Sequence, residues 1–278
     1  MKSVVLFSGL GNQIFQYAFY LGLKSKYNDV SIITNQTFGK NQHNGEELCK
    51  IFNINPTYNT WFYSNNIMFK IYKKMLLQSK LAKVYTNEYE FLHINKKPFE
   101  VYIGYFMNLK YFDFIRNELI NTLETREKLD LYNLEIINKM KSTNSLGIHI
   151  RRGDFLSFQG GIGLSLDYYK NAINFINDKN MHIFIFSDDI EFVKNDFIKL
   201  LSKNRGGVDI IDFNRGKNSY KDLILMKECK YLITANSSFS YFGAYLNKYA
   251  KLIITPKNWL GNIGDNTKYF IPKHWVKI

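Results

Sequence analysis

Apolar residues gather along the second half of this chain in short runs that alternate with longer segments of helical spacing. The runs that predict buried strands are residues 146–150, 183–186, 208–211, 231–234 and 252–254. The segments that predict helices lie near residues 168–178, 190–201, 218–228 and 239–248. Strands and helices that alternate at this spacing indicate a parallel sheet with crossover helices.

The first half of the chain follows the same order less regularly. A predicted strand at 4–7 is followed by a glycine turn and a helix from about Asn12, on which Ile14, Tyr17 and Leu21 share one face. Further strands are expected at 30–33 and 101–105, and helices at 61–84, 109–122 and 131–141. The break near residues 141–145 is expected to separate two lobes, residues 1–143 and 144–278.

The balance of charge and aromatic residues narrows the classes of partner. The chain has 37 Lys and Arg against 24 Asp and Glu, a net charge of +13, which favours nucleic acid, an acidic membrane surface or a phosphorylated ligand. No dense basic block typical of a nucleic-acid-binding arm is present. Most of the 20 Tyr and 23 Phe are expected in the core. One basic cluster on the expected 61–84 helix is either solvated or faces a membrane: Lys70, Lys73, Lys74, Lys80 and Lys83.

The two cysteines and the uncharged N-terminal stretch indicate the cellular compartment of the protein. The two cysteines, Cys49 and Cys229, form neither a disulfide framework nor a metal-ligand spacing, which fits a reducing compartment. The uncharged residues 3–23 are interrupted by the glycine turn at 8–13, so neither a secretory signal nor a spanning helix is expected there. We expect a cytoplasmic protein.

The candidate chemistry follows the predicted strand at 146–150. Arg151, Arg152 and Asp154 come directly after it, and in open α/β sheets ligands bind beyond the carboxyl ends of strands. An arginine fork matches phosphate oxygens and keeps its charge at every physiological pH. The alternative is a surface ion pair between an arginine and Asp154.

Other predicted strand and helix ends carry compatible groups. The turns at 8–13 and 235–240 both open helices, where free N–H groups favour anions. Asp189 is expected to cap a helix after Ser187 and Asp188, although these residues also suit a nucleoside contact. Asp222 is either a capping residue or a carboxylate that accepts two hydrogen bonds from the edge of guanine. Together these groups indicate a nucleoside-diphosphate pocket, and because the chain has no Asp-x-Asp sequence we expect no metal.

The chain resembles the α-1,2-fucosyltransferases of glycosyltransferase family 11 nearly from end to end. The matching segments are Gly9–Ala18, Gly104–Phe112, His149–Asp154, Ser187–Asp189 and Asn236–Asn247. Ser8 and Met107 depart from the family's pattern, which often has glycine and glutamine there. Over its C-terminal motifs, the chain is also similar to the α-1,6- and protein O-fucosyltransferases.

The resemblance implies a GT-B-like α/β fold of two facing Rossmann-type lobes with parallel sheets. Residues 1–143 would form the acceptor-side lobe and residues 144–278 the GDP-fucose-binding lobe. The implied reaction is an inverting, metal-independent transfer of L-fucose from GDP-β-L-fucose to the 2-hydroxyl of a terminal β-galactoside. The acceptor would belong to a bacterial surface polysaccharide or its lipid-linked precursor, and the enzyme would be cytoplasmic or peripheral at an anionic inner membrane face.

Site residues are expected from the strand ends and the resemblance together. The donor-binding set is Gly11, Asn12, His149, Arg151, Arg152, Ser187, Asp222, Asn236, Ser237 and Ser238. The resemblance implies that Asp222 and His149 read guanine, while the other lobe brings Gly11 and Asn12 against the diphosphate. Ser237 and Ser238 would lie beside it.

Two residues are expected to act in the reaction itself. Arg151 would stabilise the departing β-phosphate, and Asp154 is the nominal base, unless it only orients the arginines. Arg152 would pair with Asp154 or another acid and hold the loop. The alternatives are a transferase for another GDP-sugar, a non-catalytic nucleotide- or glycan-binding protein and, without any supporting motif, a nucleic-acid binder.

Overall fold

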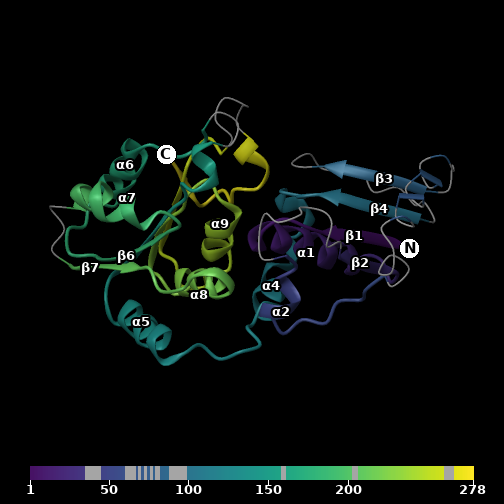
Figure 1. Cartoon of the computed structure of the whole chain (residues 1–278), viewed down its shortest axis with the longest axis horizontal. Coiled ribbons are helices and arrows are strands. Elements are labelled where there is room, and N and C mark those ends of the chain that lie inside the picture. Colours follow the sequence, from purple (N-terminus) through teal and green to yellow (C-terminus); the bar gives the residue numbers. More distant parts are fainter. Residues whose placement is uncertain are drawn as a thin grey trace. The chain divides into compact units, whose positions relative to one another are not determined.

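The computed structural model describes residues 1–34, 45–59, 82–87, 99–157, 161–201, 206–259 and 266–278, together with six helical residues between 67 and 78. The chain divides into two compact units, Met1–Glu127 and Lys128–Ile278 (Figure 1). Each unit is built on its own parallel sheet.

The first unit contains a four-stranded sheet in the order β2-β1-β4-β3, in which every neighbouring pair is parallel. Its strands are β1 (Lys2–Leu6), β2 (Val30–Thr34), β3 (Ala82–Asn87) and β4 (Phe99–Gly104). The described helices are α1 (Leu10–Lys24), α2 (Leu48–Ile51) and α4 (Arg116–Thr122). Short 3-10 turns cover Leu109–Tyr111 and Asp113–Ile115.

Aromatic packing fixes the turn that follows β4. Phe106 has a φ of 53°, a left-handed conformation in which a bulky residue is rare. Its ring stacks on Phe19 of α1 with 4.1 Å between centroids, and Tyr102 and Tyr111 meet Phe19 edge to face. The packed core therefore holds the strained turn in place, and Met107 beside it is also buried. The largest fully buried side chains of the described residues are all Tyr or Phe, so the expected core role of the aromatics is confirmed.

The second unit contains a six-stranded parallel sheet in the order β10-β9-β8-β5-β6-β7. The strands are β5 (Ser145–Ile150), β6 (His182–Ser187), β7 (Val208–Ile211), β8 (Tyr231–Ile233), β9 (Leu252–Thr255) and β10 (Val276–Lys277). The helices are α5 (Leu131–Ser142), α6 (Leu166–Ile176), α7 (Ile190–Asn195), α8 (Tyr220–Met226) and α9 (Ser238–Tyr245).

Helices cover both faces of this second sheet. On one face, Tyr169 of α6 and Val193 of α7 pack with Ile148 and Ile185 of the central strands. In Figure 1, α6 and α7 lie on one side of β6 and β7, and α5 lies on the other. Strands buried on both faces explain the continuous apolar runs of the sequence. The α/β class with parallel sheets is therefore confirmed.

The division between the units falls after Glu127, whereas the sequence analysis placed it after residue 143. The helix α5 contacts α8, and Lys221 at the start of α8 forms an ion pair with Asp130 at the start of α5. The break in pattern near residues 141–145 marks the short turn between α5 and β5. It therefore lies inside the second unit, which begins before α5.

Candidate functional site

The loops that follow β5 and β8 lie side by side at the topological switch point of the second sheet. The strand β5 has β6 on one side and β8 on the other, and the chain reverses its direction of winding between them. Open α/β sheets bind ligands outside the carboxyl ends of the strands at this point. The predicted residues after β5 and β8 therefore lie where the fold favours a ligand.

Arg151 is restrained by two carboxylates at the end of β5. Its Nη2 lies 2.6 Å from Oδ1 of Asp154, and its Nη1 lies 3.0 Å from Oδ2 of Asp188. The Arg151 side chain remains 28% exposed, so it is held in one position and still accessible to a ligand. The sequence analysis did not assign Asp188 this role, because the contact depends on β6 lying next to β5.

Arg152 makes different contacts, with residues of the segment that follows β6. Its Nε donates to Oδ2 of Asp189 at 3.0 Å, and its guanidinium lies 3.6 Å from the ring centroid of Phe192. Asp189 also caps α7 by accepting from the backbone N–H of Phe192 at 3.0 Å. Both expectations, a capping Asp189 and an Arg152 paired with another acid, agree with these contacts.

Gly153 leaves the space that Asp188 occupies. A Cβ atom at this position would meet Oδ2 of Asp188 at 2.6 Å. Oδ1 of the same carboxylate accepts from the backbone N–H of Arg152 at 2.9 Å. Asp188 therefore binds both the backbone of Arg152 and the side chain of Arg151, and a side chain at position 153 would force this carboxylate to shift.

The loop after β8 is organised by Asn236 and Ser237. The Nδ2 of Asn236 donates to the backbone oxygens of Ile162 and Trp259, at 2.8 and 2.9 Å, and so ties three loops together. Ser237 caps α9, with its Oγ accepting from the N–H of Phe239 at 3.3 Å. Ser238 is the first residue of α9. This helix start presents N–H groups of the kind that bind anions.

Buried polar atoms at this edge of the sheet have no partner within the described part of the chain. They are Nδ1 of His149, Oδ1 of Asn236, Oγ1 of Thr255 and Nε1 of Trp259. They come from the carboxyl ends of β5 and β9 and from the loops after β8 and β9. Buried polar groups are normally paired in folded proteins, so these atoms are available to hydrogen-bond a polar ligand at this edge.

His149 is neutral at physiological pH. Burial, and secondarily the charge of Arg151, lower the pKa of its imidazole to about 3. The ring packs 5.8 Å from that of Phe239, measured between centroids. A neutral imidazole offers one donor and one acceptor rather than a charge, which suits a base edge better than a phosphate.

Asp222 is a buried carboxylate in the first turn of α8. Burial raises its pKa to about 7, while a hydrogen bond from Asn214 and the nearby charge of Arg215 act in the opposite direction. Nδ2 of Asn214 lies 2.9 Å from Oδ1 of Asp222. Sequence reasoning missed Asn214, which follows β7 in a segment that had no motif.

Ser187 and Arg215 connect the ends of β6 and β7. Oγ of Ser187 accepts from the N–H of Asp189 at 3.0 Å, which shapes the turn into α7. Arg215 donates through Nη1 to the backbone oxygen of Ser187 at 2.9 Å and is otherwise exposed. The predicted residue Ser187 therefore holds the turn, and Arg215 adds an unpredicted cation at the same edge.

Gly11 and Asn12 belong to the first unit and occupy the first turn of α1, directly after β1. Nδ2 of Asn12 donates to Oγ of Ser8 at 2.9 Å, and Ser8 has a φ of 69°. Glycine adopts this left-handed conformation without steric cost, which explains why a glycine would suit position 8.

Two buried glutamines of α1, Gln13 and Gln16, connect the start of this helix to other segments, a role that sequence reasoning did not identify. Gln13 accepts from the N–H groups of Glu47 and Leu48, and Gln16 accepts from that of Phe7 and donates to the oxygen of Gly104. These hydrogen bonds connect the start of α1 to the start of α2 and to the end of β4.

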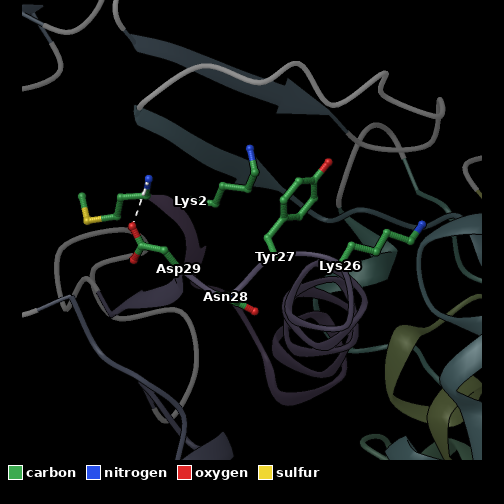
Figure 2. Close-up of a pocket in the computed structure, with 6 residues that line it drawn as sticks. Lys2, Lys26, Tyr27, Asn28 and Asp29 are labelled. Carbon is green, nitrogen blue, oxygen red and sulfur yellow. Dashed lines mark ion pairs between the residues drawn. The ribbon is translucent and has the colours of Figure 1, made fainter.

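A pocket of about 370 Å³ lies at the opposite, amino-terminal edge of the first sheet (Figure 2). Its charged groups at Met1, Lys2 and Asp29 already have partners. The amine of Met1 pairs with Asp29, and Lys2 pairs with Glu100 and lies 4.5 Å above the centroid of the Tyr27 ring. This edge precedes the strands rather than following them, so the pocket is not the candidate site.

Two features of the described residues bear on the expectations about a metal ion and a membrane span. Among these residues, no group of three or more His, Cys, Asp or Glu could hold a metal ion. In the same part of the chain, no helix has both the length and the apolar character needed to cross a bilayer. Metal independence stays a prediction.

Comparisons with known sequences agree over the whole chain. A sequence model of the family described as Glycosyl transferase family 11 matches residues 1–278. An alpha-1,2-colitosyltransferase from Escherichia coli is 31% identical over 290 residues, covering 98% of this chain and 97% of that protein. The O-antigen biosynthesis glycosyltransferase WbnK from Escherichia coli is 29% identical over 313 residues, covering 98% of this chain and 99% of WbnK.

Solved structures share the fold at low sequence identity. The NodZ alpha-1,6-fucosyltransferase from Bradyrhizobium, soaked with GDP-fucose, has a TM-score of 0.55 at 12% identity and covers 91% of this chain and 93% of its own. POFUT1 in complex with GDP has a TM-score of 0.52 at 10% identity and covers 91% of this chain and 97% of its own. The expected GT-B-like class is confirmed.

Proposed function

The chain belongs to glycosyltransferase family 11, and we propose that it moves L-fucose from GDP-β-L-fucose to the 2-hydroxyl of a terminal β-galactoside, with inversion. The observation that carries this proposal is the switch point of the second sheet. There, Asp154 and Asp188 restrain Arg151, and the start of α9 and buried polar atoms with no partner among the described residues follow strands of the same sheet edge. A nucleoside diphosphate supplies both the anion and the polar edges that such a site lacks.

The proposed donor contacts follow the chemistry of each group. Arg151, Ser237 and Ser238 bind the diphosphate, since an arginine fork and the N-terminus of a helix both favour phosphate oxygens. His149 and Asp222 bind the guanine, whose N1–H and amino group form one planar edge of donors. Further proposed donor-binding residues are Gly11, Asn12, Arg152, Ser187 and Asn236.

The proposed reaction is a single displacement. The acceptor hydroxyl attacks the anomeric carbon of fucose as the bond to the β-phosphate breaks, through an oxocarbenium-like transition state. Negative charge grows on the departing phosphate, and Arg151 stabilises that charge in place of a metal ion. Because Asp154 and Asp188 fix the guanidinium beforehand, little reorganisation is needed when the charge develops.

Asp154 is the proposed base, and its contact with Arg151 gives it a second role. One carboxylate oxygen lies 2.6 Å from Nη2 of Arg151, while the side chain is 57% exposed. The pairing supports an orienting function, and the exposure leaves the carboxylate accessible to an acceptor hydroxyl. An Asp154→Asn variant separates the two roles, because the amide can still accept a hydrogen bond from Arg151 and cannot take a proton.

A colitose donor is the second candidate, favoured by the 31% identity to the alpha-1,2-colitosyltransferase. Colitose differs from L-fucose only in lacking the 3-hydroxyl, so the two donors share the nucleotide and most of the sugar. A site that hydrogen-bonds the 3-hydroxyl rejects the deoxy sugar strongly, whereas a site that does not bind this group tolerates both.

The decisive experiment is a GDP-release assay with purified protein, a panel of β-galactosides and EDTA. Acceptor-dependent release from GDP-fucose, with an α-1,2 linkage in the product by NMR, would support the donor, the reaction and metal independence together. Faster GDP release from the colitose donor than from GDP-fucose would identify colitose as the transferred sugar. Binding of GDP-fucose without turnover on any acceptor would instead favour a non-catalytic binding protein.

The acceptor is proposed to be a surface polysaccharide or its lipid-linked precursor, reached from an anionic membrane face. This proposal is supported by the similarity to WbnK, which is described as an O-antigen biosynthesis glycosyltransferase, and by an exposed helical face in the first unit. Ile67, Ile71 and Met75 are spaced by one helical turn and are 63%, 46% and 63% exposed. Lys70 and Lys74 lie exposed beside them, so the face combines apolar side chains with positive charge. Here this face is called the Ile71 face.

A further inference from the structure

Three asparagine and aspartate side chains form a buried chain behind the proposed base-reading carboxylate. Nδ2 of Asn214 donates to Oδ1 of Asp222 at 2.9 Å, and Asn214 exchanges two hydrogen bonds with Asn133 of α5, at 2.9 and 3.2 Å. Asn133, Asn214 and Asp222 are 1%, 4% and 8% exposed. An unpaired polar group is costly in the protein interior, so the hydrogen bonds of this network fix the orientations of its side chains.

The network is anchored at its far end. Asp130 caps α5 by accepting from the backbone N–H of Asn133 at 3.0 Å, and both of its oxygens also accept from Nδ2 of Asn133. Lys221 of α8 donates to Asp130 at 2.9 Å. Asn133 is thereby fixed from behind, and it fixes the amide of Asn214 with its donor directed at Asp222.

We propose that Asn214, supported by Asn133, is a positioning residue that holds the carboxylate of Asp222 in the orientation required to read the guanine of the donor. This inference rests on the proposed function, in which Asp222 accepts from the guanine edge. Oδ2 of Asp222 has no hydrogen-bond partner among the described residues, so Asn214 occupies one oxygen and the other stays open to a ligand. The hydrogen bond to Oδ1 also restricts rotation of the carboxylate plane.

The charge of Asp222 depends on the same contact. Burial raises the pKa of this carboxyl to about 7, and the hydrogen bond from Asn214 followed by the charge of Arg215 counteract the rise. Lys221 at its side is paired with Asp130, and α9, which packs on α8, has no acidic, basic or histidine residue. Removing the Asn214 donor therefore raises the pKa of Asp222 further and leaves more of it protonated at neutral pH.

Only the ionised carboxylate accepts from both N–H groups of guanine, through the open Oδ2 and through the second lone pair of Oδ1 beside Asn214, so GDP binding is expected to weaken as the pH falls through about 7. In Asn214→Ala the same loss should occur at higher pH. A rise of one pKa unit, which is the size expected for losing a hydrogen bond to a charged group, weakens GDP binding about fivefold at pH 7 and less than about twofold at pH 8.5.

The test is calorimetric titration of the full chain with GDP and with ADP between pH 6.5 and 8.5. Adenine lacks the N1–H and the amino group of guanine, so its binding should not follow Asp222. Asn247→Ala is the matched control, because Asn247 is a buried asparagine of the same unit that ties the end of α8 through the oxygens of Met226 and Cys229. It should keep the wild-type pH profile.

The outcomes separate this inference from the proposed function. A GDP-specific loss in Asn214→Ala that shrinks as the pH rises supports the positioning role. A wild-type profile in Asn214→Ala, with the preference for GDP lost in Asp222→Ala, overturns it while base reading by Asp222 stands. Unchanged GDP binding in Asp222→Ala overturns both. If Asn214→Ala does not fold, Asn133→Ala carries the test, because it withdraws the support of Asn214 and should shift the profile in the same direction.

Discussion

At the scale of single residues, Arg151 combines accessibility with restraint, and this combination predicts a severe and specific loss on substitution. Both Arg151→Ala and Arg151→Lys are expected to lower kcat about 100- to 1000-fold, because an ammonium group cannot contact Asp154 and Asp188 and still present a fork to phosphate. Thermal unfolding should change little, since the side chain is partly exposed. Lys199→Ala, at a surface pair on the same unit, is the control. Retention of a tenth of the wild-type rate by Arg151→Lys would contradict the assignment.

Gly153 gives a second prediction at this scale. In Gly153→Ala the new methyl group would meet Oδ2 of Asp188 at 2.6 Å, so the oxygen that contacts Arg151 must shift. Steady-state kinetics should show a strong fall in kcat/KM with a modest fall in Tm. Gly163→Ala is the matched control in the same region, because its methyl group would lie 3.4 Å from Leu156, an ordinary contact. Equal activities of the two variants would show that Asp188 is not needed to hold the arginine.

The residue roles that sequence could predict are those set by neighbours in the chain. Asp189 caps the helix that follows it by accepting from the N–H of Phe192, only three residues further along the chain, so the local sequence is enough to predict this role. Asp188 and Asn214 act on residues of other strands and helices, at separations of 36 residues for Asp188 and Arg152, and 81 for Asn214 and Asn133. Such contacts depend on strand order and on side-chain direction, which no local pattern contains.

At the scale of secondary-structure elements, the hydrophobic pattern located the strands of the second sheet well. The predicted run at 208–211 coincides with β7, and the runs at 146–150 and 183–186 fall within β5 and β6. The strands β5 and β6 are buried on both faces, so their apolar runs are continuous and easily recognised. The two-residue strand β10 was missed, because so short a segment has no periodicity to detect.

The predicted helix at 61–84 was wrong at its end. Residues 82–87 form β3, a strand that pairs with β4, so Lys83 does not belong to a helical cluster. Its segment Val84-Tyr-Thr86 is rich in β-branched and aromatic residues, which was a signal for a strand. Lys73 and Lys80 lie outside the described residues. Likewise, the predicted helix at 109–122 is two 3-10 turns followed by α4, and the expected helix at 190–201 ends as α7 at Asn195 before a further 3-10 turn.

The junction of β1 and β4 in the first sheet offers a test of how elements are joined. Gln16 of α1 accepts from the N–H of Phe7 and donates to the oxygen of Gly104, which follow or end these two strands. Gln16→Leu would leave both backbone groups buried without partners and should lower the free energy of unfolding by about 2–4 kcal/mol. Urea denaturation measures this loss, and the exposed Gln78→Leu should stay within about 0.5 kcal/mol of wild type. A neutral effect of Gln16→Leu would mean that water replaces the amide.

At the scale of the whole molecule, the order of elements predicted the class of fold better than the extent of its units. Alternating strands and helices indicated parallel sheets, and both sheets are parallel throughout their described pairs. The boundary was displaced to Glu127 because α5 packs on the second sheet although it precedes that sheet in sequence. A helix before the first strand of a doubly wound sheet can belong to either unit by sequence alone, and tertiary contacts decide.

The net charge of +13 and the Ile71 face together predict how the whole protein meets its acceptor. Vesicles that contain anionic lipid should bind the protein at low salt, and neutral vesicles should not. Replacing two exposed lysines of the face in Lys70→Glu/Lys74→Glu should weaken this binding at least about tenfold, because each basic residue near an anionic surface contributes about 1 kcal/mol.

Charge alone must be separated from the combination of charge and apolar contact. Lys170→Glu/Lys179→Glu changes the net charge by the same amount on the exposed surface of the second unit and serves as the matched control. Met75→Ser removes apolar contact from the Ile71 face without changing the charge and should also weaken sedimentation with anionic vesicles, while turnover of a water-soluble acceptor stays unchanged in every variant. If the control pair loses vesicle binding as strongly as the Ile71-face pair, the attraction is a property of the overall charge. The proposed docking face would then be rejected, because a specific face must be more sensitive to its own residues than to a distant change of equal charge.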